Sequence, residues 1–168
     1  MVCSKHFELL EDDRFLVTVY QPVEKDLRLQ LKDNINGPGH QNVIKEIKFQ
    51  DIDDLTVSPN LQNIVVYHNV TSADGKVRNM VSSYDKDLKS LDEDTEMEES
   101  VASLTKSISY DGTYLIDDRG LLKSAGTGST IMDFMALDSK TKTPYNFLIN
   151  YRDTIMVNSS EKLYGIAY

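Results

Sequence analysis

The fold class is decided by one segment, Leu61-Gln-Asn-Ile-Val-Val-Tyr-His-Asn-Val-Thr-Ser-Ala-Asp-Gly-Lys-Val-Arg-Asn-Met-Val-Ser-Ser-Tyr84. Both halves of the segment are rich in residues that favour strands, and Asp74-Gly75 between them suits the two central positions of a type I′ turn. The segment therefore predicts a β-hairpin. Pairing outward from that turn puts one set of side chains on the apolar face, namely Ile64, Val66, His68, Val70, Val77 and Val81. The other face then carries Tyr67, Asn69, Thr71, Arg78 and Ser82.

Further strands are predicted on both sides of this hairpin. Before it, residues 14–20 are rich in β-branched and aromatic residues, and residues 26–33 alternate strictly between leucine and polar residues. Residues 43–49 suit a third strand, although their apolar positions would also fit one helical turn. After the hairpin, strands are predicted at 114–116, 121–123, 131–137, 145–151, 154–157 and 163–168.

An acidic segment from Asp85 to Glu99 divides the chain into two β halves. Downstream of it, Met97, Val101, Leu104 and Ile108 recur at helical spacing, and Thr95 with Glu98 has the spacing of a capping box. These patterns predict one amphipathic helix over residues 96–109. Residues 85–94 are interpreted as an acidic flexible connector.

Together these patterns predict an α+β fold that is predominantly antiparallel β. We expect a sandwich or open barrel of nine or ten strands, with the helix covering one face or one end. The chain of 168 residues has the usual length of one domain, so we expect residues 1–168 to form a single domain.

Composition constrains the compartment and the kind of partner. One cysteine, Cys3, excludes an intrachain disulfide, and neither a signal peptide nor a membrane-spanning run is evident, so an intracellular, cytoplasmic-type protein is expected. The net charge of −9 disfavours direct binding to nucleic acid and favours a basic protein partner. A homo-oligomer is also compatible with the composition.

Candidate chemical sites are few. His6, His40 and His68 lack metal-binding spacing, and the signatures of common nucleophile and zinc enzymes are absent from the sequence, so no cofactor and no metal are predicted. The run 92–96 begins like a calcium loop, but Met97 and Ser103 replace the glycine and glutamate that such a loop requires. Residues 123–130 resemble a phosphate loop, yet a strand is expected to follow them, so we interpret them as a turn.

The sequence therefore favours a non-catalytic interaction protein that binds a macromolecule through its acidic segment, an exposed sheet edge, or both. The predicted contact residues are Asp92, Glu93, Asp94, Glu96, Glu98 and Glu99 in the acidic segment, and Tyr164 and Tyr168 on the last strand. One alternative is a carrier that holds a small apolar ligand inside a β-barrel. Another is an enzyme that uses carboxylates such as Asp117, Asp118 and Asp133.

Overall fold

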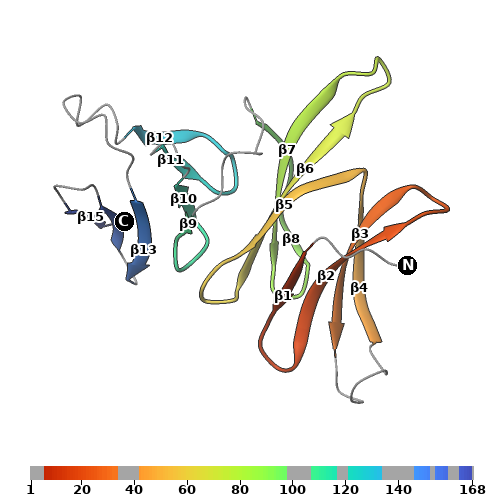
Figure 1. The fold of residues 1–168 in the computed structure, drawn as a ribbon, viewed down its shortest axis with the longest axis horizontal. Helices are drawn as coiled ribbons and strands as arrows, with labels where there is room; N and C mark the ends of the chain where they lie inside the picture. The colour runs from red at the N-terminus through yellow and green to blue at the C-terminus, as the bar shows by residue number, and fades with distance from the viewer. Residues whose placement is uncertain are drawn as a thin grey trace.

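The computed structural model describes residues 6–33, 42–97, 107–116, 121–133, 146–151, 154–158 and 163–167. These residues form fifteen strands, which are arranged in four antiparallel sheets (Figure 1). The predominantly antiparallel β fold is therefore confirmed. The described residues contain no helix, and hence none that is long and apolar enough to span a membrane.

The N-terminal sheet consists of β1 (Phe7–Leu9), β2 (Arg14–Gln21), β3 (Asp26–Asp33) and β4 (Asn42–Phe49), in that order. β3 has the bounds that its alternating leucines predict. Leu29 and Leu31 lie opposite Thr18 and Leu16 of β2, so leucines fill one face of this sheet. That face is buried.

The central sheet follows directly, because the chain turns at Gln50 from β4 into β5. It consists of β5 (Asp51–Val57), β6 (Asn63–Thr71), β7 (Val77–Asp85) and β8 (Ser90–Met97), again in chain order. β5 was not predicted, because its apolar residues Ile52 and Leu55 are three positions apart. A bulge between Ile52 and Asp54 explains this spacing, since the extra residue returns Leu55 to the buried face.

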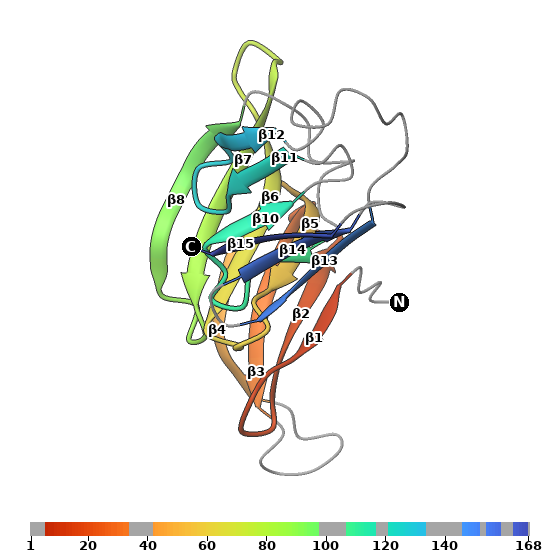
Figure 2. The ribbon, with the colours of Figure 1, turned by 90° about the vertical axis from the view of Figure 1, so that its left-hand side faces the viewer.

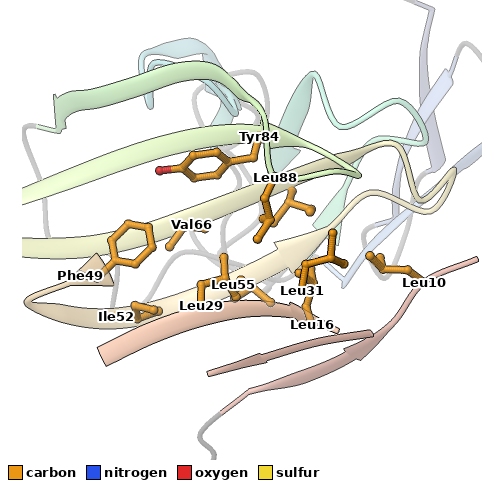
Figure 3. Packing of buried hydrophobic residues seen from close by; sticks show 11 residues of the cluster. Leu10, Leu16, Leu29, Leu31, Phe49, Ile52, Leu55, Val66, Tyr84 and Leu88 are labelled. Carbon is orange, nitrogen blue, oxygen red and sulfur yellow. The ribbon is translucent and has the colours of Figure 1, made fainter. Parts of the chain in front are cut away.

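The main core lies between the N-terminal and central sheets (Figure 3). Leu16, Leu29 and Leu31 pack from one sheet against Ile64, Val66 and other residues of the other sheet. At one end of this core lie Phe49 and the hydroxyl end of Tyr84, whereas Leu10 lies at the other end. Burial of such side chains stabilises the fold by about 1.5–3 kcal/mol each.

The β6–β7 hairpin forms as predicted, but its register differs by one residue from the prediction. Its loop has three residues, 73–75, and only Gly75 among them has a positive φ, of 79°. Asp74 does not adopt the left-handed conformation that a type I′ turn requires, so the loop is one residue longer than the predicted two-residue loop. As a result Val81 lies opposite Tyr67, and Ser82 lies opposite Val66, on the face that carries His68.

The third sheet packs on the other face of the central sheet. It consists of β9 (Ser107–Ile108), β10 (Tyr114–Ile116), β11 (Leu121–Ser124) and β12 (Thr130–Asp133). Tyr67 and Val81 of the central sheet form a second core with Leu115 and Ile108. β6 is therefore buried on both faces, which accounts for its five consecutive buried residues, 64–68.

The C-terminal sheet consists of β13 (Asn146–Tyr151), β14 (Thr154–Asn158) and β15 (Leu163–Ala167), with β14 in the middle. β13 lies beside β9 of the third sheet. β15 is thus an edge strand within the described residues, at the place where the sequence predicts an edge.

Two further sequence predictions are wrong. The helix predicted at 96–109 is contradicted at both ends, because Glu96 and Met97 belong to β8 and residues 107–108 form β9; residues 98–106 lie outside the described residues. Met97 and Ile108 do share one buried cluster, as the helical stripe implied, but they reach it from two strands. The fifteen strands exceed the predicted number of about nine or ten, and β1, β5, β8 and β9 have no counterpart among the predicted segments.

Candidate functional site

Four of the six acidic residues predicted to bind a partner lie on β8, the outer strand of the central sheet (Figure 2). Asp92, Asp94 and Glu96 are exposed there. Glu93 also belongs to β8, whereas Glu98 and Glu99 lie outside the described residues. The segment 85–94, predicted as a connector, comprises the end of β7, a turn at 86–89 and the first five residues of β8.

β8 has a single strand neighbour, β7, within the described part of the chain. An edge strand presents a row of backbone N–H and C=O groups that can pair with another chain. Leu91, which is 57% exposed, adds an apolar side chain to this edge. Acidic side chains and an open sheet edge, which the sequence suggested as separate features, therefore coincide on one strand.

A bulge in β8 places the exposed Asp94 beside Ser82 of β7. Val81 pairs with Thr95 and Ser83 pairs with Asp92, so two residues of β8 face Ser82. Asp94 has a φ of 52°, a left-handed conformation that aspartate tolerates better than most residues. Its backbone N–H donates a hydrogen bond to the Ser82 hydroxyl at 3.1 Å. The bulge thus places the Asp94 carboxylate beside the buried face.

His68 forms the buried end of this arrangement. It is only 3% exposed, and its Nε2 lies 2.9 Å from the Ser82 hydroxyl and 3.3 Å from Oδ1 of Asp94. The ring packs edge-on against Phe49, with 4.9 Å between the ring centroids. The prediction that His68 points toward the apolar side is therefore confirmed.

Burial lowers the pKa of His68 below its ordinary value, and the charges of Asp94 and Asp53 oppose this shift in part. The imidazole is therefore neutral at pH 7, so its contact with Asp94 is not an ion pair. Ser82 and Asp94 also face the same ring nitrogen. In a serine-hydrolase triad the carboxylate binds the nitrogen opposite the serine, so this cluster lacks the geometry that activates a nucleophile.

A cleft of about 250 Å³ opens between β4 and the central sheet beside this cluster. It is lined by residues 47–50 together with His68, Val70, Tyr84 and Asp94. Ile47 and Phe49 pair with Leu29 and Leu27, so they face the core. Lys48 lies between them in the strand, and its side chain therefore points to the opposite face of the sheet.

A larger cleft, of about 470 Å³, lies between the end of β8 and the hairpin of β11 and β12. Its lining includes Glu96, Met97, Lys123 and residues 127–130. The predicted phosphate-loop-like segment 123–130 is thus the turn of this hairpin, as expected, and a strand rather than a helix follows it. No helix N-terminus faces this cleft within the described residues.

The structure describes only two of the other candidate residues. Tyr164 belongs to the edge strand β15, and Asp133 is exposed on β12. The remaining candidates, Asp117, Asp118, Tyr168 and His40, lie outside the described residues. Within the described ranges no group of three histidine, cysteine or carboxylate side chains could hold a metal ion.

Sequence reasoning missed Ser82, the residue that links His68 to Asp94. The predicted register placed Ser82 on the opposite face, so no contact with His68 could be inferred. Comparisons with known proteins add no assignment: no protein-family model matches the chain, and no curated protein matches it.

Proposed function

We propose that this chain is a protein-interaction module that binds a basic, extended segment of a partner protein along β8. The observation that carries the proposal is the coincidence of exposed carboxylates with an edge strand in one element. A segment added to β8 would gain main-chain hydrogen bonds from the edge and charge complementarity from its side chains.

Charge selects among the possible partners of this edge. A second copy paired along β8 would bring its own Asp92, Asp94 and Glu96 to the same edge, and like charges on paired strands destabilise a sheet. The net charge of −9 likewise repels nucleic acid. A segment rich in lysine or arginine meets neither obstacle.

The ion pair between Arg78 and Glu96 is weak. Arg78 of β7 lies 3.6 Å from Glu96, and both side chains are more than half exposed. Exposed pairs of this kind contribute only about 0–1 kcal/mol, so a partner side chain can replace Arg78 at small cost. Asp92 forms no ion pair within the described residues, and it is exposed.

The proposal is tested with a synthetic peptide, acetyl-(Thr-Lys)4-amide, which is extended, β-prone and basic. It is titrated into the full ¹⁵N-labelled chain at low salt, and an acidic peptide with glutamate in place of lysine serves as the peptide control. We expect the basic peptide to shift amide resonances of residues 90–97. Equal shifts with both peptides, or shifts confined to other strands, would count against the proposal.

A matched pair of variants separates local from global charge. One variant neutralises the edge with Asp92→Asn, Asp94→Asn and Glu96→Gln. The control neutralises three exposed acidic residues of the β1–β2 turn with Glu11→Gln, Asp12→Asn and Asp13→Asn. Both remove three charges. At about 0.5 kcal/mol for each charge pair, the edge variant should bind the basic peptide about tenfold more weakly. The control variant should bind within about twofold of the wild type.

A further inference from the structure

We infer that the cleft beside Asp94 is a pocket for one lysine side chain, which would be supplied by the segment that pairs with β8. The inference rests on the proposed function, because it assigns one side chain of that partner to a particular place. It rests on the geometry of the cleft as well as on the acidity of β8.

One wall of the cleft is apolar and aromatic, and the rest of its lining is polar. Ile47 and Val70 contribute aliphatic surface, and Phe49 and Tyr84 contribute rings at the same end of the core (Figure 3). Long amphipathic side chains bury their methylene groups against surfaces of this kind and leave the charged end at the rim. An ammonium group is also attracted to the faces of aromatic rings.

The polar end of the cleft suits an ammonium group. The bulge holds the Asp94 carboxylate at the cleft, with Oδ1 directed toward His68 and Ser82. Lys48 lines the cleft, but strand alternation directs its side chain away, so its charge does not lie inside. His68 is neutral at pH 7 and does not compete for the carboxylate as a cation.

The size and position of the cleft fit a single side chain. Its volume of about 250 Å³ is below the 300–1,000 Å³ of pockets that hold drug-sized ligands. A strand added to β8 would lie about 4.8 Å from it, so a long side chain on the His68-bearing face can reach Asp94. Lysine fits better than arginine, because Oδ1 of Asp94 already faces His68 and Ser82, and a bidentate partner needs both oxygens.

The test uses n-butylammonium, which has the stem and head of a lysine side chain, and therefore does not depend on strand pairing. It is titrated into the ¹⁵N-labelled full chain at pH 7.5, with n-butanol as the uncharged control. We expect saturable shifts at the amides of residues 47–50 and Val70, and affinity about fivefold weaker in Asp94→Asn. Asn should keep the left-handed backbone at this position, so the variant is expected to fold.

The outcomes separate the inference from the proposed function. Equal binding of n-butanol, or no saturable shift at the cleft, overturns the lysine pocket even if the basic peptide still binds β8. Conversely, n-butylammonium binding that Asp94→Asn weakens, without binding of the peptide, supports the pocket and refutes strand pairing. If both ligands bind, each lysine of the peptide is replaced in turn by norleucine. The replacement at one of these peptide positions should weaken binding about fivefold more than the replacements at the other positions.

Discussion

The Ser82→Ala substitution tests the cluster that joins β6, β7 and β8. The Ser82 hydroxyl is fully buried, contacts Nε2 of His68 at 2.9 Å and accepts a hydrogen bond from the Asp94 N–H at 3.1 Å. At about 1 kcal/mol for each hydrogen bond, its removal should lower the free energy of unfolding by about 2 kcal/mol. For a chain of this length, that loss corresponds to a fall in Tm of about 4–8 °C.

The assay is urea unfolding of the wild type, Ser82→Ala and Ser83→Ala, followed by circular dichroism. Ser83 is the matched control, because it is the next residue of β7 and its side chain is half-buried on the opposite face. Ser83→Ala should stay within about 0.5 kcal/mol of the wild type. If Ser82→Ala were no more destabilising than Ser83→Ala at an unchanged m-value, the Ser82 hydroxyl would not stabilise the cluster.

Three further predictions concern the histidine, a buried hydroxyl and a turn. Burial lowers the pKa of His68 below its unfolded value of 6.5, so the unfolded chain binds more protons than the folded chain as the pH falls below 6.5. Stability should therefore fall as the pH decreases through this value. The difference between the urea midpoints at about pH 7.5 and 5.5 should be smaller in His68→Gln than in the wild type. The Tyr67 hydroxyl is buried without a hydrogen-bond partner in the part of the chain that the structure describes. Tyr67→Phe should therefore leave the free energy of unfolding unchanged or raise it by up to about 1 kcal/mol in the same assay. A loss of about 2 kcal/mol would contradict the structure. Gly128 has a φ of 67°, and the methyl group of an alanine at this position would meet Met97. Gly128→Ala should therefore lower the free energy of unfolding by about 1–2 kcal/mol. This loss should be larger than that caused by Gly75→Ala, where φ is 79° but nothing lies within 4 Å of the added methyl group.

Strands with regular alternation could be predicted from the sequence. The leucines of 26–33 and the hairpin 61–84 identify β3, β6 and β7, because a half-buried strand repeats every two residues. β5 could not be found in this way, because its bulge puts three positions between Ile52 and Leu55. A pattern search with a strict period of two fails wherever the strand contains an extra residue.

β8 was missed for a different reason. Its acidic residues have low strand propensity, and Thr95 with Glu98 has the spacing of a helix cap. The strand exists because β7 supplies its hydrogen bonds and because its position at the edge exposes the carboxylates to solvent. Tertiary pairing therefore overrides local preference here, and single-sequence patterns carry little information about such pairing.

The candidate site could be predicted only in part. The acidic residues were identified from composition alone, and His68 was placed toward the apolar side. The His68–Ser82–Asp94 cluster depends on a hairpin register that one additional loop residue changes, and on a bulge in a strand that was not predicted. Both features are local backbone details, and each one moves a side chain to the other face of the sheet.

Pairing of the edge strand β8 with a basic, extended segment is the core of the proposed function. Amide hydrogen exchange, measured residue by residue with and without acetyl-(Thr-Lys)4-amide, tests this claim most directly. The peptide should slow exchange at alternate amides of residues 90–97, whose N–H groups face away from β7, and should leave β5 at the opposite edge unchanged. Binding of the peptide without added protection along β8 would contradict the claim.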